Sequence, residues 1–599
     1  MPFVSKEEIL KLVQLKKFGA DLVVNLLMQI FKLKKIREFY AEREQLEPLD
    51  FINEVLNYLE VEYEILEADI KKIPANEAFI VISNHPFGGI DALIMYKIIS
   101  QQRSDFKILT TIDVKQIKPL EDCFFYINNY EKKKKSKETN YQSLKSVFEH
   151  IQKNGCLGVF PSGEVAAYSL ENSNFVDRTW DIATIKLIKS MNVPVIPLNF
   201  QASENFIINI LGKIHPLLKT VRLSPDIFTK KDKVIKIRIG TPISKKEQSA
   251  FTDNEEFGRF LRARTYSLVH KIEVNPLFFK PKFRWKKPQP ISEAKPIEQL
   301  VDEINTTIEK YLLFSVKEFK VFCAPAQDIP VALHELGRLR EITFREVGEG
   351  TNKDIDLDEY DIYYHHLIIW DEVNRKIVGA YRIGKGKDIL ALYGINGFYV
   401  TSLFDISNKL EPILQQSLEL GRSFIIKEYQ RKPLPLYLLW KGLLYFVLKN
   451  QEYRYLTGPV SISNQFSEFS KSLIVQFIHS HYFNHELAQY VKSRKKFSIP
   501  KDIQQDINTL VKQSAKNLNV LDDLIYDIES DLRIPVLLKK YLSIGAKIVS
   551  FNIDPKFNNC LDGLIILDIF DIPSDVILNL SKEMLDNSVL ERFKINTDD

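Results

Sequence analysis

Residues 78–100 read AFIVISNHPFGGIDALIMYKIIS, and this stretch decides the fold of the first half of the chain. It opens with a short, mostly apolar and β-branched run, 78–84, which is typical of a buried strand. The glycines and proline of HPFGG favour a tight loop, and the apolar run 91–100 fits a helix. A strand, a loop and a helix in this order form one unit of a layered α/β domain.

The same alternation continues toward the linker, so we expect an α/β domain over residues 1–275. Apolar runs of strand length recur, and helical patterns separate them. The expected strands are 106–111, 156–160, 193–200 and 235–240, and the expected helices are 140–153 and 178–191.

Residues 275–297 carry five prolines and no clear hydrophobic period, which predicts a linker at 276–298. A mixed α+β domain is expected over 299–599. Its expected strands are 319–322, 364–370, 376–384, 397–400, 454–463, 546–554 and 560–569, and its expected helices are 297–315, 409–428, 435–450 and a polar insertion at 500–525. The fold class is therefore α/β with two domains.

Composition excludes several classes of protein. The chain has 599 residues, of which 45% are hydrophobic and 27% charged, as in ordinary globular proteins. Four cysteines without CxxC spacing argue against a disulfide scaffold or a structural zinc site and favour a reducing cytosol. The first residues lack the apolar core of a signal peptide, and no apolar run of about 18 residues is free of charge.

The basic residues are unevenly distributed. The net charge is +4, and the excess lies in residues 1–280, with a dense patch at 213–238. This bias fits an anionic partner or ordinary surface variation. Residues 22–31, LVVNLLMQIF, have lysines on both sides. They fit an amphipathic helix at a bilayer surface or a core helix with solvated ends, and both interpretations stay open.

The loop after the first strand carries the first candidate site. His85 is a suitable general base because the pKa of histidine lies near neutral pH. On a continuous helix, His85 and Asp91 would lie on different faces. A tight PFGG loop instead lets the carboxylate of Asp91 turn back onto the imidazole ring, fix its tautomer and stabilise its charged form.

Five short blocks, in this order, resemble the glycerolipid acyltransferase family over roughly residues 75–245. Asn84 to Asp91 is similar to the NH(x4)D motif with one more residue, as in the branch with ornithine-lipid acyltransferases and hemolysin-like proteins. The other blocks are FPSGEV (160–165), VPVIP (193–197), GKIHP (212–216) and IGTPI (239–243). The resemblance implies that His85 removes a proton from an acceptor hydroxyl, which attacks an acyl thioester, and that Asp91 orients His85. It implies a substrate-binding set, with backbone N–H groups near two glycines holding the oxyanion: Asn84, Gly88, Ser162, Gly163 and Glu164.

One departure from the family pattern bears on the acceptor. The family's FPEGTRS block has an arginine thought to hold the acceptor's phosphate, and Val165 stands there in this chain. Ser162 replaces the glutamate of the same block. We therefore expect a hydroxyl acceptor without a phosphate. Glu164 either orients this acceptor or pairs with a nearby basic residue.

The second half carries scattered polar residues that are weak signals alone. Residues 356–366 place three aspartates before two histidines, which fits a metal site or, more commonly, a polar turn leading into a strand. In their order, these residues and later blocks resemble the N-acyltransferase of ornithine-lipid synthesis, a relative of the GNAT and acyl-homoserine-lactone synthase folds. Coverage is roughly 320–570, and the block RIPVLLKKYLSIGA (533–546) with Asp554, Phe557 and Asp562 also fits.

This second resemblance implies roles for five residues. Glu419 is the expected base or amine binder, and His366 is a second candidate base. Three arginines, Arg345, Arg382 and Arg422, are expected to bind the substrate carboxylate or the phosphate of a phosphopantetheine arm. An internal ion pair is an equally good interpretation of each.

Together the two resemblances imply a bacterial bifunctional aminolipid synthase, an acyltransferase. Its C-terminal domain N-acylates ornithine with a 3-hydroxyacyl group, and its N-terminal domain esterifies the new hydroxyl. The acyl donor is acyl carrier protein or coenzyme A, with no bound cofactor, metal or nucleic acid. The expected location is cytoplasmic and peripheral, at the inner face of the cytoplasmic membrane. The alternatives are glycine as the amino acid, a scaffold with one inactive module, or a phospholipid acyltransferase with a regulatory C-terminal domain.

Overall fold

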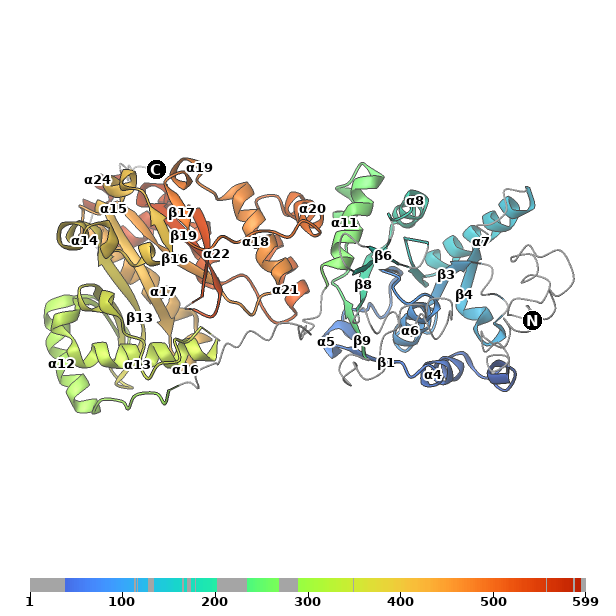
Figure 1. Ribbon diagram of the computed structural model, residues 1–599, viewed down its shortest axis with the longest axis horizontal. Helices are drawn as coiled ribbons and strands as arrows, with labels where there is room; N and C mark the ends of the chain where they lie inside the picture. The colour runs from blue at the N-terminus through green and yellow to red at the C-terminus, as the bar shows by residue number, and fades with distance from the viewer. Residues whose placement is uncertain are drawn as a thin grey trace, which may run out of the picture. The chain divides into compact units, whose positions relative to one another are not determined.

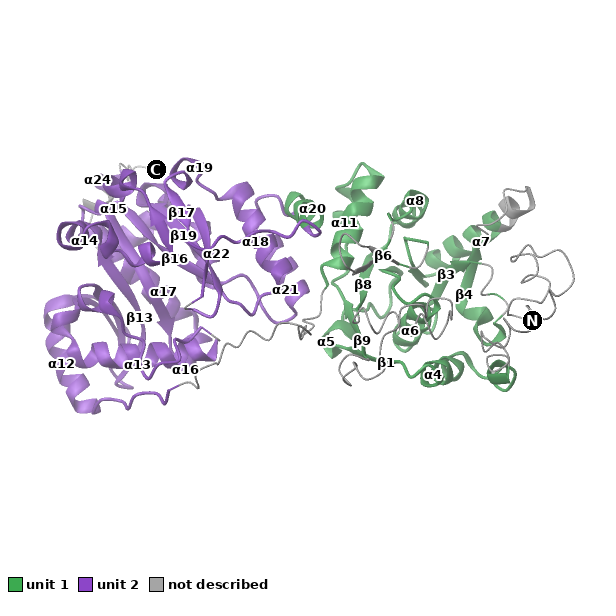
Figure 2. Cartoon of the chain, in the orientation of Figure 1, with its two compact units in different colours: residues 1–273, 504–513 green, residues 274–503, 514–599 purple. Residues whose placement is uncertain are grey.

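The chain divides into two compact units, shown in Figure 2. Unit 1 is Met1–Glu273 with Gln504–Gln513, and unit 2 is Val274–Ile503 with Ser514–Asp599. The computed structural model describes residues 38–111, 115, 117–127, 134–163, 166–169, 174–177, 179–201, 234–268, 289–347, 349–555, 557–584 and 588–593. Several residues for which the sequence made predictions lie outside these ranges. They are residues 6–37, Glu164, residues 212–216, most of the basic patch at 213–238 and most of the linker.

Unit 1 is built on a seven-stranded sheet in the order β1-β9-β8-β2-β5-β3-β4 (Figure 1). Every neighbouring pair is parallel except β8 and β9. All five residues of β2 are buried, as expected of a central strand in a parallel sheet. The strands are β1 Glu62–Ile65, β2 Phe79–Ser83, β3 Lys107–Thr111, β4 Phe124–Ile127, β5 Cys156–Val159, β8 Val195–Gln201 and β9 Val234–Ile239.

Helices and a small hairpin complete unit 1. Helices α4 (Pro48–Tyr58) and α6 (Gly89–Ser100) share one apolar cluster with Phe79 and Val81 of β2. Gly258 of α11 (Asn254–Tyr266) lies against Ile185 of α8 (Ile182–Met191). Unit 1 also holds α5 Glu67–Ile70, a 3-10 helix at Lys118–Cys123, α7 Lys134–Gln152, α10 Lys245–Ser249 and a hairpin of β6 Ala167–Ser169 and β7 Asn174–Val176.

Unit 2 is built on an eight-stranded sheet in the order β10-β11-β12-β13-β15-β16-β19-β18. All its pairs are antiparallel except β15 with β16. The strands are β10 Leu312–Val316, β11 Phe319–Pro325, β12 His365–Asp371, β13 Lys376–Lys385, β15 Ser417–Ile425, β16 Tyr455–Ile462, β18 Lys547–Asp554 and β19 Cys560–Asp568. A second sheet pairs β14 (Phe404–Ile406) with β17 (Val491–Ser493).

Helices pack against the large sheet of unit 2. Leu300 and Leu336, from α12 and α13, share an apolar cluster with Ile368 of β12. Gly442 of α17 lies against Val321 and Leu367 of neighbouring strands, where a side chain would collide with them. The described helices of unit 2 are α12 Ile297–Tyr311, α13 Pro330–Glu346, α14 Gly386–Tyr393, α15 Glu411–Gln415, α16 Lys427–Gln430, α17 Pro433–Lys449, α18 Glu468–His481, α19 His485–Ala488, α21 Leu518–Glu529, α22 Val536–Ser543, α23 Ser574–Met584 and α24 Ser588–Phe593. Helix α20, Gln504–Ser514, belongs to unit 1 except for its last residue.

The parallel pair β15 and β16 diverges after three residue pairs. Its register runs from Ser417–Tyr455 to Glu419–Thr457 and stops there. Gly458 follows directly, with φ at +153° and its hydrogen facing the Leu420 carbonyl. A cavity of about 270 Å³ lies where the two strands separate.

Three sequence predictions of local structure in unit 2 are wrong. Residues 409–428 were expected to form one helix, but only Glu411–Gln415 (α15) do so within 409–416, and Ser417–Ile425 form β15, which lies between β13 and β16. The spacing of its leucines fits a helical period. However, β15 is paired with a neighbouring strand on each side, and this pairing overrides the local preference for a helix. A strand was expected at 397–400, but Tyr399–Ser402 form a 3-10 helix. A helix was expected at 297–315, but α12 ends at Tyr311.

No helix among the described ranges is long and apolar enough to cross a membrane. The four cysteines, Cys123, Cys156, Cys323 and Cys560, are buried and unpaired. The described residues hold no group of three or more His, Cys, Asp or Glu side chains arranged for a metal ion.

The strand divergence depends on Gly458, which gives a first prediction. A Cβ at this position would lie 2.2 Å from the Leu420 carbonyl oxygen. We expect Gly458→Ala to lower the free energy of unfolding by about 2–3 kcal/mol, since strained backbone and overpacking both oppose the native state. Thermal unfolding measures this.

Gly421→Ala is the matched control across the same gap. Its Cβ would meet nothing closer than the Arg382 Nε at 3.9 Å. Equal melting temperatures for the two variants would contradict a packing requirement at Gly458.

Candidate functional site

The loop between β2 and α6 brings His85 onto Asp91. The His85 Nδ1 lies 3.0 Å from the Asp91 Oδ2, and the Phe87 N–H donates to the same oxygen at 2.9 Å. Gly88, with φ at +67°, allows the sharp turn into the helix. With Nδ1 engaged by a carboxylate, the Nε2 is the ring nitrogen left to take a proton from a substrate.

Burial sets the electrostatics of this pair. Asp91 is fully buried, whereas the side chain of His85 is 16% exposed. Desolvation raises the pKa of Asp91 to about 6, against the opposing effects of His85 and the Phe87 N–H. The carboxylate is therefore mostly ionised at neutral pH and can stabilise an imidazolium.

The main chain of His85 is held on both sides, which the sequence did not reveal. The His85 N–H donates to the Asp177 Oδ1 at 3.0 Å, and the Ala166 N–H donates to the His85 carbonyl at 2.9 Å. The Trp180 indole donates to the other oxygen of Asp177 at 3.2 Å. Asp177 lies 92 residues from His85, and no motif marks it.

The described part of the FPSGEV block, residues 160–163, begins beside His85. The Phe160 ring stacks on the His85 ring with centroids 4.2 Å apart. Ser162 is buried and Gly163 is exposed, with φ at +66°. The Gly163 N–H donates to the Phe160 carbonyl at 3.0 Å, so this amide is not the oxyanion donor that was expected.

Asn84 has a structural role instead of the expected substrate contact. Its side-chain amide donates to the Phe200 carbonyl at 2.9 Å, and its oxygen accepts from the Phe200 N–H at 2.8 Å. Both polar ends are thereby used in joining the end of β2 to β8.

In unit 2, the cavity at the strand divergence is the candidate site. Apolar residues of β15, β16 and α22 line much of it, and several polar side chains converge on it. The polar and charged lining residues are Glu349, Tyr381, Tyr399, Arg422, Ser423, Ser461, Tyr541, Asp554 and Asp562.

Of the five residues of unit 2 that were given roles from the sequence, Arg422 alone lines this cavity, although Asp554, Phe557 and Asp562 of the later motif line it too. It sits in the left-handed conformation, with φ at +49°, near a register shift between β13 and β15. Its guanidinium pairs with Asp356 at 2.9 Å and Asp358 at 3.3 Å.

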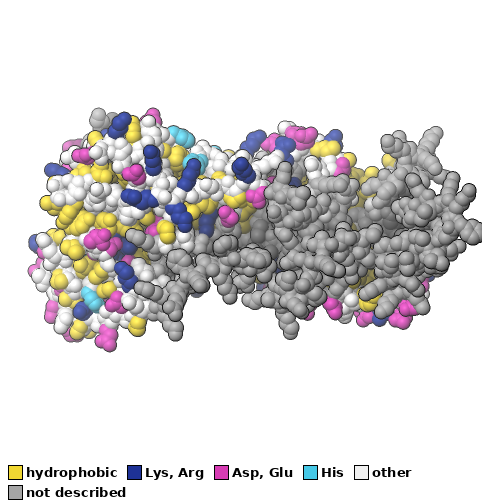
Figure 3. Space-filling view, viewed as in Figure 1, with side chains coloured by type: hydrophobic (Ala, Val, Ile, Leu, Met, Phe, Trp, Pro, Cys, Tyr) yellow, Lys and Arg dark blue, Asp and Glu magenta, His cyan; other side chains and the backbone are white. Residues whose placement is uncertain are grey.

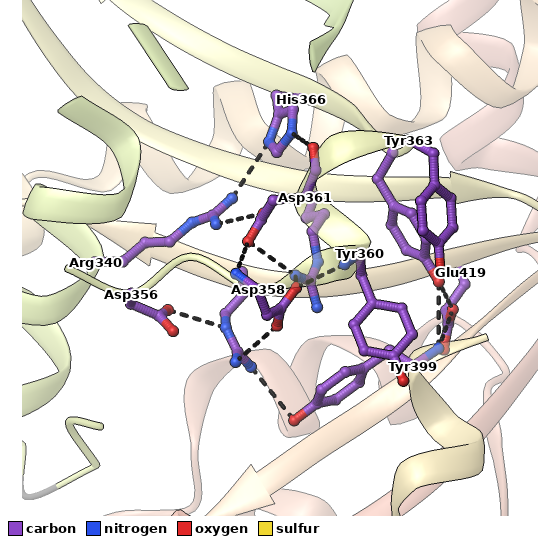
Figure 4. A network of polar contacts seen from close by, with 12 residues as sticks. Arg340, Asp356, Asp358, Tyr360, Asp361, Tyr363, His366, Tyr399 and Glu419 are labelled. Atoms are coloured by element: carbon purple, nitrogen blue, oxygen red, sulfur yellow. Dashed lines mark hydrogen bonds and ion pairs between the residues drawn. The ribbon is translucent and has the colours of Figure 1, made fainter. Parts of the chain in front are cut away.

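Arg382 belongs to a buried network behind the cavity, shown in Figure 4. It pairs with Asp358 at 2.5 Å and Asp361 at 3.2 Å, and Arg340 pairs with Asp361 at 2.7 Å. The side chain of Arg382 is 1% exposed. Of the two interpretations of this arginine, the internal ion pair is the one seen.

His366 lies in the same network and has no access to a substrate, contrary to its expected role as a base. It is fully buried, its Nε2 faces the Asp361 carbonyl at 3.2 Å, and its Nδ1 faces Arg340 at 3.3 Å. Burial beside Arg340 lowers the pKa of His366 to about 3, which keeps the ring neutral.

Glu419 does not line the cavity either. It accepts the Val400 N–H at 2.7 Å and the Tyr399 N–H at 3.0 Å, together with the Tyr364 hydroxyl. Burial raises the pKa of Glu419. Instead of the expected base, Glu419 is a positioning residue for the turn that carries Tyr399 into the cavity.

Arg345, in the last turn of α13, is not among the residues that line the cavity, although Phe344 beside it is. It donates to Glu341 at 2.6 Å, to the Gln289 carbonyl at 2.9 Å and to the Lys353 carbonyl. The structure thus gives this arginine the internal ion pair instead of a substrate anion.

Each of the two units matches a known protein family. Residues 65–201 match the acyltransferase family, and residues 339–440 match the acetyltransferase (GNAT) domain family. The chain thus contains an acyltransferase domain followed by a GNAT domain, and the protein is an acyltransferase. Both families work on an acyl donor.

Two relatives are named glycine Nα-acyltransferase. The protein of Phocaeicola vulgatus is 27% identical over 270 residues, which are 42% of this chain and 79% of the relative. That of Bacteroides thetaiotaomicron is 30% identical over 204 residues, 32% of this chain and 60% of the relative.

Two solved structures are also similar to parts of the chain. The 1-acyl-sn-glycerophosphate acyltransferase PlsC of Thermotoga maritima shares 14% identity with a TM-score of 0.25, covering 40% of this chain and 90% of its own. The loading GNATL domain of CurA from Lyngbya majuscula shares 17% identity with a TM-score of 0.21, covering 42% and 98%.

The buried carboxylate of Asp91 predicts an unusual dependence of stability on pH. Its pKa is raised in the folded state, so the native protein holds this proton more tightly than the unfolded chain, and the contribution to stability falls as pH rises from about 4 to about 6. We expect Asp91→Asn to raise the free energy of unfolding by about 1–3 kcal/mol above pH 6, with no gain below about pH 4. Unfolding measured across pH 4–8 checks this.

Asp253→Asn is the control, because the pKa of Asp253 is shifted in the opposite direction to that of Asp91. N–H groups of α11 lower the pKa of this exposed carboxylate, so its replacement offers no gain at neutral pH. An Asp91→Asn variant that is less stable than wild type at pH 8 would contradict the burial cost.

Proposed function

We propose that the chain makes a two-chain aminolipid by successive N- and O-acylation. Unit 2 transfers a 3-hydroxyacyl group to the α-amine of an amino acid, and unit 1 then esterifies the new 3-hydroxyl with a second acyl group. The observation that carries the proposal is the presence in one chain of the His85–Asp91 pair and a GNAT-type cavity lined by both an arginine and carboxylates.

The cavity of unit 2 matches the groups of an amino acid. Arg422 offers a cation to the substrate carboxylate, and Asp554 and Asp562 offer anions to its amine. Where β15 and β16 part, their facing backbone groups are available to an extended thioester arm, as in strand addition to a sheet edge.

In unit 1, the His85 Nε2 takes the proton of the acceptor hydroxyl as the oxygen attacks the thioester carbonyl. The tetrahedral intermediate then collapses, the C–S bond breaks, and the imidazolium returns the proton to the leaving thiolate. Asp91 keeps the ring in the required tautomer and stabilises its charged form.

The acceptor is a hydroxyl without a phosphate. Val165 stands where the related pattern has an arginine, and a valine cannot pair with a phosphate. An N-(3-hydroxyacyl) amino acid fits this requirement, since its anionic group is a single carboxylate.

We propose ornithine as the amino acid, because the cavity lining holds three acidic side chains and one basic one. Glu349, Asp554 and Asp562 line it, and Arg422 is the one cation among the described residues of the lining. A second amine would balance this excess. Glycine is the second candidate, and the names of the two relatives favour it.

The proposed acyl donor is an acyl thioester of acyl carrier protein, with acyl coenzyme A as the alternative. The proposed site of action is the inner surface of the cytoplasmic membrane. The lyso-lipid carries one chain, which anchors only marginally at about 0.8 kcal/mol per buried CH2, so two sites in one chain limit its escape. On the face drawn in Figure 3, Lys and Arg side chains lie among hydrophobic ones over unit 2, a mixture that suits an anionic surface.

Lipid mass spectrometry after expression in a host without such lipids tests the proposal. Wild-type chain should yield a di-acylated amino acid whose head-group mass identifies ornithine or glycine. His85→Ala should accumulate the mono-acylated lyso-lipid, because only the second step is lost. Arg422→Ala should lower both lipids at least about tenfold, because the first step fails, and Glu419→Ala should lower both by displacing Tyr399.

His485→Ala, at an exposed histidine of unit 2, is the control and should leave both lipids unchanged. Unchanged di-acylated product from His85→Ala would overturn the role of unit 1. Activity of the wild-type chain on lysophosphatidic acid, lost in His85→Ala, would instead indicate a phospholipid acyltransferase with a regulatory C-terminal unit.

A further inference from the structure

Among the residues that line the cavity of unit 2, Asp562 stands out by its position. It lies on β19, is 2% exposed, and accepts the Ser461 hydroxyl at 2.6 Å from the neighbouring strand β16. It therefore lies in the cavity wall beside the gap between β15 and β16. In the proposed N-acylation the substrate amine binds in this cavity and must lose a proton there to a base.

The base that sequence reasoning assigned is not available there. Glu419 is committed to two backbone amides and the Tyr364 hydroxyl, and His366 is fully buried within the ion-pair network. Neither lines the cavity. The proton of the incoming ammonium must pass to another group.

We infer that Asp562 is the catalytic base of the N-acylation, an inference that rests on the proposed function of unit 2. The substrate ammonium gives one proton to the Asp562 carboxylate, and the neutral amine attacks the thioester carbonyl, forming the C–N bond. The C–S bond then breaks, and the second proton of the nitrogen goes to the leaving thiolate. Asp562 releases its proton to solvent, so the products are the amide, a free thiol and one proton.

The surroundings of Asp562 suit this role. Burial raises its pKa to about 7, and the nearby charges of Asp554 on β18 and Glu349 after α13 act in the same direction. The Ser461 hydroxyl and Arg422 on β15 act in the opposite direction. The charge of Asp562 also acts on Tyr399 and Cys560. A base with a pKa near the working pH combines a useful ionised fraction with proton affinity.

The test uses purified full-length chain with ornithine or glycine and a 3-hydroxyacyl thioester of acyl carrier protein. Thiol release and N-acyl product are followed from pH 5.5 to 9. For wild type, kcat should rise with pH through an inflection near 7. Asp562→Asn should lower kcat at least about 100-fold and abolish that inflection.

Ser461→Ala keeps the carboxylate and keeps the inference testable if Asp562→Asn misfolds. It removes a hydrogen bond that favours the ionised form, so the inflection should move to higher pH. Asp568→Asn is the matched control: this aspartate ends the same strand, pairs with Arg454 and lies outside the cavity. It should keep the wild-type rate and profile.

Three results would overturn the assignment while leaving the proposed function intact, two of them from Asp562→Asn. One is Asp562→Asn with a wild-type rate, and the other is a reduced rate that keeps the inflection, which indicates a structural role. An inflection that Ser461→Ala leaves in place also contradicts it. Failure of wild-type chain to acylate either amino acid would instead overturn the proposed function, and the inference with it.

Discussion

A charge inside a protein must be paired or hydrogen-bonded, because its desolvation is otherwise too costly. Both units are organised around this requirement. In unit 1, the fully buried carboxylate of Asp91 is tolerated because His85 and the Phe87 N–H bind it, and these contacts fix the geometry of the loop. In unit 2, Arg340 and Arg382 are almost wholly buried and held by Asp358 and Asp361. The chemistry of each site follows from how these charges are satisfied.

The two units satisfy their charges differently. Unit 1 keeps one histidine partly exposed at the edge of a buried pair, so the pair can exchange a proton with a substrate. In unit 2, Arg340, Arg382 and His366 of the network are buried, while Arg422 and Tyr399 connect the network to the cavity, whose lining also holds Glu349, Asp554 and Asp562. The first arrangement suits a hydroxyl acceptor, and the second suits a zwitterionic one.

Sequence reasoning reached the first site more fully than the second. His85 and Asp91 are six residues apart in a loop with turn-forming glycines, so local rules sufficed to predict their contact. Asp177, 92 residues away from His85, had no such signal. In unit 2, the helical spacing of leucines hid β15, and with it the register shift and the left-handed Arg422 that bring residues 420–423 to the cavity but not Glu419. Asp562 matched a motif, but its place in the cavity wall could be recognised only from the pairing of β16 with β19.

In the proposed pathway, unit 1 acts on the hydroxyl that unit 2 introduces. To test this, the purified chain is given an amino acid, a 3-hydroxyacyl donor and an isotopically labelled saturated acyl donor. The product is cleaved with mild alkali and analysed by mass spectrometry. We expect alkali to release the labelled chain as a fatty acid and to leave an unlabelled N-(3-hydroxyacyl) amino acid. A product whose label resists alkali, or one without any ester-linked chain, would contradict it.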